Sequence, residues 1–532
     1  MGFAARAVTR AWRSCVAMSD IGHPEISARS VSAVIERLRA MPRTDTPRNL
    51  SPAALAAAAK QPPPAISPIV LAGMVRMAEF LLILLVGFAI YAKYVLVAHS
   101  FGWNYAAATG AIAVLSIVAF QAADIYQIQA FRGYEKQYMR LAAAWSLVFL
   151  AVMGAAFFLK AGEQFSRVWL GSFYVVGLLT LLAFRRIVFV LVRRWTKAGY
   201  LTRRTVIVGG GETGAAVINA LARQKNLGLE FIGLFDDRAD DRSGNECAGQ
   251  PKLGSVNDLV EFGRRTRVDL VIFSLPISAE ARILAMLKKL WVLPVDIRLA
   301  AHANKLQFRP RSYSYIGSVP VIDVADRPIA DWDVVMKWLF DKIVGSLLLI
   351  AALPVMALVA LALKVDSRGP ILFKQQRYGF NNDLIEVFKF RSMYVQSADV
   401  KADKLVSKND PRVTRVGRLI RKASLDELPQ LFNVVFKGNL SLVGPRPHAV
   451  NAKAEERRYD EAVDGYFARH RVKPGITGWA QINGWRGETD TQEKIQQRVE
   501  HDLYYIENWS VLLDLYILAR TPVSLLKSEN AY

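Results

Sequence analysis

Long apolar stretches constrain what this chain can fold into more than any other feature of its sequence. Four of them follow one another in the N-terminal part, and each is close to or above the ~20 residues that cross a ~30 Å hydrocarbon core as a helix. We therefore predict a four-helix transmembrane domain at residues 69–195. Its helices are predicted at Ile69–Val97, Tyr105–Ala123, Leu141–Lys160 and Val168–Val192.

The charges of the connecting segments predict how these helices are oriented. Arg132, Lys136 and Arg140 lie between the second and third apolar runs, and the basic segment Arg193–Lys197 follows the fourth. The segment between the first and second runs carries no Lys or Arg. Because positively charged loops stay in the cytoplasm, we expect the N-terminus and everything after the fourth helix to face the cytoplasm.

Composition excludes several classes of protein. Of the 532 residues, 52% are hydrophobic and only 21% are charged, and the net charge is +22. This hydrophobicity is too high for a disordered protein. A soluble nucleic-acid-binding protein would not carry such long uncharged stretches, so we expect no nucleic acid partner. Two cysteines, Cys15 and Cys247, are too few for a disulfide scaffold or a multi-cysteine zinc site. Residues 1–68, basic and rich in Pro and Ala, are predicted to be a disordered tail.

Residues 203–325 have the pattern of a soluble α/β domain. Short apolar runs typical of strands alternate there with longer stretches typical of helices. Gly209, Gly211 and Gly214 fit the pattern G-x-G-x-x-G directly after a predicted strand. Asp236 and Asp237 follow the next strand, where a ribose-binding acid would lie. The pattern predicts a Rossmann-like domain. Two interpretations stay open: the turn binds a nucleotide, or the domain keeps the tight turn without that ligand.

A fifth apolar run, Ile343–Leu363, carries no charge and is long enough to span a membrane. Pro354 lies at its middle, where it removes a backbone donor and kinks a helix. Basic residues flank the run on both sides, Lys337 and Lys342 before it and Lys364 after it. These flanks favour a re-entrant helix, which dips into the inner leaflet and returns. A Pro-kinked helix that crosses the membrane stays open.

Downstream of this run, two adjacent acids, Asp426 and Glu427, lie among spaced lysines and arginines. Adjacent carboxylates suit a metal ion together with a nucleophile, and the planar fork of Arg suits phosphate oxygens. The same acids would also stabilise the N-terminus of a helix that Ser424 caps. Local spacing alone does not decide between a catalytic pair and the start of a helix.

Five sequence blocks in the C-terminal part, taken in order, resemble the bacterial polyprenyl-phosphate sugar-1-phosphate transferases of the monotopic phosphoglycosyl transferase superfamily. Four N-terminal helices and a Rossmann-like domain before them resemble the large branch that starts exopolysaccharide or capsule repeat units. Residues 483–490 look most like the undecaprenyl-phosphate glucose phosphotransferase subgroup. The family breaks its re-entrant helix at a Ser-Pro step, whereas here Leu353 precedes Pro354. The blocks are Gly369–Gly379, Phe388–Met393, Leu419–Leu431, Ser441–Pro447 and Lys473–Gly484.

The resemblance implies a reaction and a role for each site residue. A sugar-1-phosphate, glucose-1-phosphate by subgroup, would pass from a UDP-sugar to undecaprenyl phosphate with release of UMP. Asp426 would hold the phospho-sugar covalently, and Glu427 would bind Mg²⁺. Galactose or another hexose stays open as the transferred sugar. The cations expected to contact phosphate are Lys374, Arg377, Lys389, Arg391, Arg421 and Arg446.

Together, the apolar runs and the resemblance imply a multi-pass protein of the bacterial inner membrane. Its fold class would be membrane α plus α/β: four transmembrane helices, a Rossmann-like cytoplasmic domain, and a small α/β catalytic domain that includes the re-entrant helix at residues 331–532. The implied partners are the UDP-sugar, undecaprenyl phosphate and membrane lipids, and a homo-oligomer stays open.

Two other classes of protein share some of these features. A membrane-bound, NAD-dependent sugar-nucleotide dehydratase would explain the N-terminal half, but it would use a Tyr-x-x-x-Lys pair, and the chain has no such spacing. A non-catalytic polysaccharide export or scaffold protein would explain the apolar helices and the charge. It would not explain the ordered acid and cation motifs.

Overall fold

The computed structural model describes the chain from Leu50 onward with several gaps. The first 49 residues of the predicted tail lie outside the described residues. Within the described part, five helices are long and apolar enough to cross a membrane, so this is a membrane protein that also carries α/β parts. The described ranges are 50–60, 62–97, 101–126, 135–160, 164–224, 228–238, 246–276, 279–301, 314–394, 410–448, 453–454, 457–458, 466–485, 487 and 491–527.

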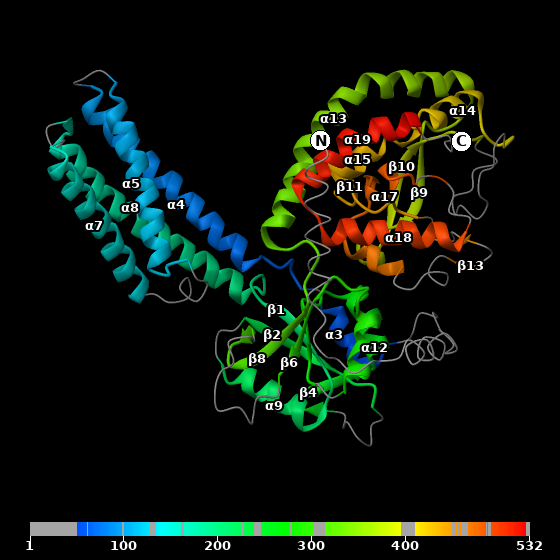
Figure 1. Cartoon of the computed structure of the whole chain (residues 1–532), viewed down its shortest axis with the longest axis horizontal. Helices are drawn as coiled ribbons and strands as arrows, with labels where there is room; N and C mark the ends of the chain where they lie inside the picture. The colour runs from blue at the N-terminus through cyan, green and yellow to red at the C-terminus, as the bar shows by residue number, and fades with distance from the viewer. Residues whose placement is uncertain are drawn as a thin grey trace, which may run out of the picture. The chain divides into compact units, whose positions relative to one another are not determined.

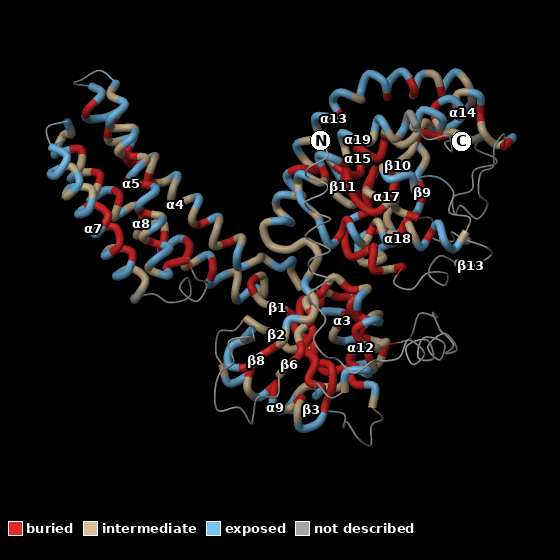
Figure 2. Tube along the Cα trace, viewed as in Figure 1, coloured by how far each residue is buried: buried red, intermediate tan, exposed pale blue. Residues whose placement is uncertain are grey.

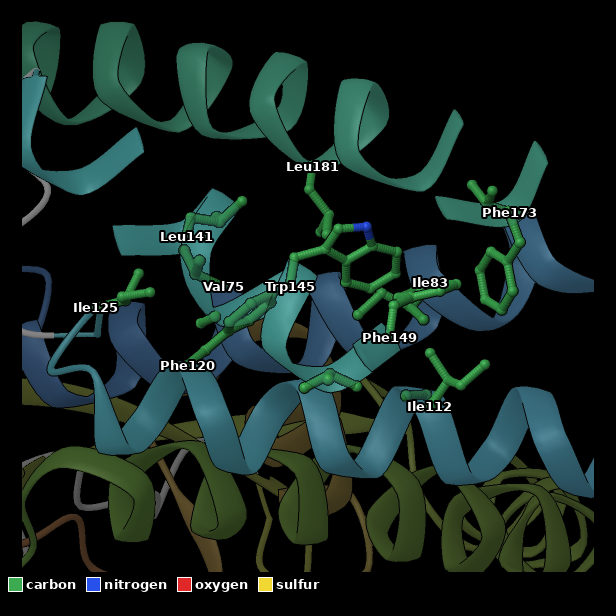
Figure 3. Packing of buried hydrophobic residues seen from close by; sticks show 14 of the residues in the cluster. Val75, Ile83, Ile112, Phe120, Ile125, Leu141, Trp145, Phe149, Phe173 and Leu181 are labelled. Carbon is green, nitrogen blue, oxygen red and sulfur yellow. The ribbon is translucent and has the colours of Figure 1, made fainter. Parts of the chain in front are cut away.

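Four of the apolar helices form a bundle (Figure 1). Their bounds fall within a few residues of the predicted apolar runs, except that α7 and α8 begin or end with a further polar turn. Figure 3 shows Trp145 in the middle of the bundle core, with Leu181 directly beside its indole ring. The helices are α4 (Pro68–Ile90), continued by the π-helix η1 (Tyr91–Val95), α5 (Trp103–Ala122), α7 (Glu135–Phe158) and α8 (Arg167–Lys197).

A buried ion pair joins two helices of this bundle. The Glu79 carboxylate on α4 contacts Arg185 on α8, with 2.5 Å between Oε1 and Nε, and the Tyr126 hydroxyl donates to Glu79 Oε2 at 2.7 Å. Arg76 lies on α4 as well, but its guanidinium donates to Gln121. An Arg76–Glu79 pair within α4, which the i, i+3 spacing suggests, is therefore not formed. A charge buried among apolar helices needs a partner, and Arg185 supplies it from a neighbouring helix.

The Rossmann-like part is a mixed sheet of eight strands in the described residues, in the order β3-β4-β2-β1-β5-β6-β8-β7. The five central strands run parallel, and β3, β8 and β7 pair antiparallel at the edges. Figure 2 shows that buried residues follow the central strands, as expected of a sheet covered on both faces. The predicted alternation of strands and helices is confirmed, and the described residues of this part form eight strands and three helices. They are β1 (Arg203–Val208), α9 (Gly211–Ala222), β2 (Leu229–Phe235), β3 (Glu246–Cys247), β4 (Gln250–Gly254), α11 (Val256–Arg265), β5 (Leu270–Phe273), α12 (Glu280–Leu290), β6 (Asp296–Ala300), β7 (Ser314–Ile316) and β8 (Val319–Ala325).

The prediction that residues 1–68 form a disordered tail is wrong for its last part. Helix α3 (Pro52–Ala59) forms there, and the Ser51 hydroxyl caps it by accepting from the Ala54 amide. Ala54 and Ala58 are buried in the core of the Rossmann-like part. Alanine has the highest helix propensity of all residues, so an Ala-rich segment that reads as low complexity folds once it has an apolar surface to cover.

The C-terminal part begins with α13 (Asp331–Asp366), a single helix that contains Pro354. Figure 1 draws α13 with a sharp bend along its length, and proline is the usual cause of such a bend. Leu349, Met356 and Leu363 of α13 share a core with residues of several later elements. Fifteen elements follow α13 in the described residues. They are β9 (Leu372–Tyr378), η4 (Phe380–Asn382), β10 (Leu384–Phe390), α14 (Arg415–Lys422), η6 (Leu425–Glu427), α15 (Gln430–Phe432), η7 (Asn433–Lys437), β11 (Ser441–Val443), β12 (Lys453–Ala454), β13 (Arg457–Arg458), η8 (Tyr466–Arg471), β14 (Gly475–Thr477), α17 (Trp479–Ile482), α18 (Gln492–Glu507) and α19 (Val511–Lys527).

Candidate active site

The two adjacent acids lie on a short turn between two helical segments. Helix α14 ends at Lys422, and Ser424 then takes the left-handed conformation, with φ 56°. Asp426 and Glu427 follow in the 3₁₀ turn η6, and the Ser424 hydroxyl does not cap it. Non-glycine residues adopt positive φ at a cost of about 1–3 kcal/mol, and such residues cluster at active sites. A plain capped helix start is therefore not what this segment forms.

Glu427 is held from two sides by cations. Arg446 forms a bidentate pair with it, with Nη2 donating to Oε1 at 2.6 Å and Nη1 to Oε2 at 3.2 Å. Lys389 Nζ donates to Oε1 at 2.9 Å. Burial raises the pKa of Glu427, but the charges of Arg446 and Lys389 outweigh it, and the pKa ends well below its usual value. Glu427 is therefore ionised at any pH at which the protein works.

The pKa of Asp426 shifts in the opposite direction from that of Glu427. Burial and then the negative charge of Glu427 raise its pKa above the usual value. Lys389, Arg421 and Arg446 oppose that rise through their charges, so the same cations act on both carboxylates. Two neighbouring acids whose pKa values move apart suit two different roles. The higher-pKa carboxylate is the more basic one, which is the property expected of a nucleophilic oxygen.

Two elements far apart in sequence bring these cations to the turn. Lys389 lies near the end of β10, and the Asn433 side chain holds this strand by accepting from the Phe388 amide at 2.9 Å and donating to the Glu386 carbonyl at 2.6 Å. Arg446 follows β11, which pairs with β14. A Cβ on Gly475 of β14 would collide with the Gly444 amide, so the backbones approach this closely only because both residues are glycines.

The other predicted cations are placed differently. Arg421 lies in the last turn of α14 and acts on Asp426 by its charge. Arg391 is buried and donates three hydrogen bonds of 2.7–2.9 Å to Ser367 and the Arg368 carbonyl, where it closes the C-terminal end of α13. Lys374 is largely exposed and lies 3.6 Å from Glu386 across the β9–β10 hairpin. Arg377 donates to Gln375 at 2.6 Å. The structure thus brings Lys389, Arg421 and Arg446 to the acids, and it gives the other three contacts elsewhere.

A cavity of about 430 Å³ adjoins the turn. Ser424, Glu427 and Arg446 form its polar end, and leucines and alanines of α13 and α19 form its apolar walls. Gln481 also lines it; this side chain is only 6% exposed, and its Oε1 has no hydrogen-bond partner among the residues that the structure describes. A cavity with a charged end and apolar walls fits an amphipathic ligand with an anionic head.

The two acids fit a magnesium ion only together with a substrate. In the part of the chain that the structure describes, no three His, Cys, Asp or Glu side chains gather closely enough to hold a metal ion. Mg²⁺ is commonly bound through one or two carboxylates, with waters and substrate phosphates as its remaining ligands. The carboxylates of Asp426 and Glu427 fit that pattern only if a ligand supplies further oxygens.

The glycine-rich turn of the Rossmann-like part has the expected local shape. Gly209 and Gly211 have φ of 100° and 80°, and α9 begins at Gly211. Gly214 lies in the first turn of α9. The Asp236 carboxylate accepts the Gly210 amide at 2.7 Å and the Arg238 amide at 3.0 Å. The acid expected at a ribose thus holds the turn itself.

Several buried charged residues of the C-terminal part were missed by the sequence reasoning. Asp514 of α19 is fully buried and accepts from Lys337 at 2.6 Å and from the Tyr505 hydroxyl at 2.8 Å. Both donors also bond the Val443 carbonyl of β11, two residues before Pro445. Asp502 of α18 is a second buried acid, and the sequence carried a signal for its burial. It lies at helical spacing from Ile495, Val499 and Ile506, on the buried face of α18.

Comparison with known proteins gives the family. The model of the bacterial sugar transferase family matches residues 332–528, which include the turn, Lys389 and Arg446. A UDP-glucose:undecaprenyl-phosphate glucose-1-phosphate transferase of Xanthomonas campestris pv. campestris is 34% identical over 430 residues, which cover 80% of this chain and 88% of that protein. The chain belongs to the bacterial sugar transferase family. Membership in this family sets aside both the dehydratase and the non-catalytic scaffold.

Other matches agree with this family membership and add detail. A CoA-binding domain model matches residues 121–301. The exopolysaccharide production protein PSS of Rhizobium leguminosarum bv. phaseoli is 45% identical over 192 residues, 36% of this chain and 96% of that protein. An undecaprenyl-phosphate galactose phosphotransferase of Salmonella typhimurium is 30% identical over 404 residues, 73% of this chain and 81% of that protein. The relatives of this sugar transferase thus differ in the sugar that their names give.

Proposed function

We propose that this sugar transferase moves glucose-1-phosphate from UDP-glucose to undecaprenyl phosphate, releases UMP, and so starts an exopolysaccharide or capsule repeat unit. The observation that carries the proposal is the turn that holds Asp426 beside a Glu427 clamped by Lys389 and Arg446. The name of the Xanthomonas relative supports glucose as the sugar, and the name of the Rhizobium relative supports exopolysaccharide as the product class.

The reaction proceeds in two displacements at one phosphorus atom. A carboxylate oxygen of Asp426 attacks the phosphorus that carries glucose, the anhydride bond to the other phosphate breaks, and UMP leaves with the electron pair. An oxygen of undecaprenyl phosphate then attacks the same phosphorus, and the bond to Asp426 breaks. One phosphoanhydride replaces another, so the energy change is small. Two inversions leave the phosphorus with its original configuration.

The charges of the site suit these steps. Donor diphosphate, acceptor phosphate and Asp426 are all anionic, so cations must offset their repulsion. Lys389, Arg421 and Arg446 supply three positive charges, and these charges oppose the rise that burial causes in the pKa of Asp426. Glu427 would hold Mg²⁺, which when bound would reduce the negative charge of the diphosphate. Arg446 would exchange part of its pairing with Glu427 for phosphate oxygens.

The lipid acceptor suits the cavity beside the turn. Its charged end would take the phosphate, and the walls built by Leu348 of α13 and Leu518 of α19 would take the first isoprene units. UDP-glucose is cytosolic and the acceptor lies in the membrane, so the site belongs at the inner face of the inner membrane. Helix α13 would serve that position as a re-entrant helix bent at Pro354, with both ends in the cytoplasm.

A direct test measures UMP formation by the purified full-length protein in nanodiscs. We expect continued turnover of UDP-glucose to UMP only when undecaprenyl phosphate and Mg²⁺ are both present, at most one UMP per protein molecule without the lipid, and no UMP from Asp426→Asn. The same assay with UDP-galactose decides the sugar, because a faster reaction with UDP-galactose would assign this chain the activity that names the Salmonella relative. Failure with every UDP-hexose, by a folded protein, would contradict the proposed function.

A further inference from the structure

We infer that Arg469 and Asp502 are positioning residues that hold Arg446 in the geometry of its bidentate pair with Glu427. This inference rests on the proposed function, because it assigns to two buried side chains the task of placing a cation of that site. Both residues lie in elements away from the turn, Arg469 in η8 and Asp502 in α18.

Arg469 contacts both ends of the segment that carries Arg446. Its Nη2 donates to the Arg446 carbonyl oxygen at 2.8 Å, and its Nη1 lies 2.7 Å from Nδ1 of His448. Its Nη1 also lies 3.1 Å from Nε2 of His448, and because arginine has only donors, the imidazole accepts this hydrogen bond. The guanidinium therefore fixes residue 446 by its backbone and residue 448 by its side chain, with Pro447 between them.

Asp502 in turn fixes Arg469. Its Oδ2 lies 2.5 Å from Arg469 Nη2, and the two side chains are 2% and 0% exposed. A buried ion pair in close contact is rigid, because moving either partner leaves an unpaired charge away from water. The contacts therefore form a chain that runs from Asp502 through Arg469 to the Arg446 backbone, and then through the Arg446 guanidinium to Glu427.

The bidentate pair at the end of this chain depends on accurate placement. A planar fork meets a carboxylate through two parallel hydrogen bonds, so small displacements of the arginine backbone cost one of them. Functional groups hold such geometry when residues behind them are locked by packing and hydrogen bonds. The backbone contacts between β11 and β14 fix the segment up to Pro445, and Arg469 continues that support through residue 448.

The test uses Arg469→Lys and Asp502→Asn in the full-length protein. Lysine keeps the charge but cannot reach Asp502, the Arg446 carbonyl and His448 at once, and asparagine keeps a hydrogen bond without the charge. Loss of such a supporting contact commonly costs about 10- to 100-fold in activity, and we expect this loss in kcat/KM for UDP-glucose. Arg412→Lys is the matched control, because its guanidinium pairs with Asp410 at 2.6 Å in another loop.

A double-mutant cycle with Arg446→Lys separates positioning from general support of the fold. If Arg469 acts through Arg446, Arg469→Lys should cost little further activity once Arg446 is lysine. Arg412→Lys should combine with Arg446→Lys additively, within about twofold. Equal losses from Arg469→Lys in both backgrounds would overturn the inference, because they would show that Arg469 acts independently of Arg446.

Hydrogen exchange gives a readout that does not depend on activity. We expect faster exchange at the amides of Gly444, Arg446 and His448 in Arg469→Lys and Asp502→Asn, and wild-type exchange there in Arg412→Lys. Unchanged exchange in both variants would overturn the inference even if the wild type is fully active. Conversely, a wild type that transfers no sugar would contradict the proposed function, and the exchange measurement would still decide whether Arg469 and Asp502 hold the segment.

Discussion

Glu427 is the residue on which the charges of the candidate site converge. Its two oxygens take three hydrogen bonds from Arg446 and Lys389, which leaves the adjacent Asp426 with the more basic carboxylate. At the scale of single residues, the structure thus separates two acids that look equivalent in the sequence. Glu427 is an anion paired with two cations, and Asp426 carries the more basic carboxylate, which the proposed mechanism uses as the nucleophile.

Removing the charge of Glu427 should therefore affect transferase activity differently from removing the charge of Asp426. We expect Glu427→Gln to lower kcat by about 10- to 100-fold, as for other changes at a metal site, and part of that activity should return at high Mg²⁺. Asp426→Asn should stay inactive at any Mg²⁺ concentration, because a metal ion cannot supply the missing nucleophile. Rates measured over a Mg²⁺ titration check both outcomes, and equal recovery of the two variants would contradict these roles.

Two buried histidines predict a pH dependence of stability. Burial, and then the charge of Arg469, lowers the pKa of His448 and of His470 well below the usual value. In the unfolded chain both take up a proton near pH ~6.5, whereas in the folded protein they stay neutral. The unfolded state therefore binds more protons, and stability should fall as the pH drops below about 6.5.

Thermal unfolding between pH 5 and pH 7 measures this effect. Each histidine contributes at most about 1.4 kcal/mol per pH unit. We expect the pH dependence to be weaker in His448→Gln/His470→Gln than in the wild type, because glutamine does not titrate. The same slope in both proteins would show that other groups cause the acid sensitivity.

At the scale of elements, the apolar periodicity of the sequence and its turn residues predict most of the helices and strands. The strands around Gly209 and the four helices of the bundle follow from their apolar patterns and are found near the predicted bounds. Helix α3 was missed because an Ala-rich run has no apolar face of its own until the Rossmann-like core covers it. Charged residues that face inward, such as Asp514, were missed because their partners come from elements distant in sequence.

Pro354 gives the element-scale prediction. In the wild type, single cysteines placed near Lys337 and Asp366, in a chain without its native cysteines, should both react only with reagents that reach the cytoplasm. Pro354→Ala restores the missing backbone hydrogen bond and should straighten α13. We then expect the site near Asp366 to become accessible from outside in part of the population. Reaction of that site from outside in the wild type would contradict the re-entrant helix.

At the scale of the whole molecule, the residues of the candidate site all come from the C-terminal part. The described contacts of Asp426, Glu427, Lys389 and Arg446 lie within residues 331–532. The sequence predicts well that the site residues lie in the C-terminal part, because the motif blocks lie there. It is a poorer guide to which of the cations contact the two acids. Arg391 resembles the other cations in sequence, yet its partners are the carbonyls of Ser367 and Arg368, directly after the end of α13.

This division of labour predicts that residues 327–532 retain transferase activity when produced alone in nanodiscs. We expect UMP formation that still requires undecaprenyl phosphate, at a rate reduced by the loss of contacts such as that between Arg327 and Asp269. The four-helix bundle and the Rossmann-like part would then serve assembly or regulation. Complete inactivity of a truncated chain with the wild-type circular dichroism of its helices would assign catalytic duties to the N-terminal half.

The most direct test of the account follows the phosphate group itself. The donor is UDP-glucose that carries radioactive phosphorus in the phosphate next to glucose. With undecaprenyl phosphate present, the account predicts that the label enters the lipid and that the released UMP is unlabelled. Without the lipid, it predicts that the label stays on the wild-type protein and is absent from Asp426→Asn. Labelled UMP, or equal labelling of the wild type and Asp426→Asn, would contradict it.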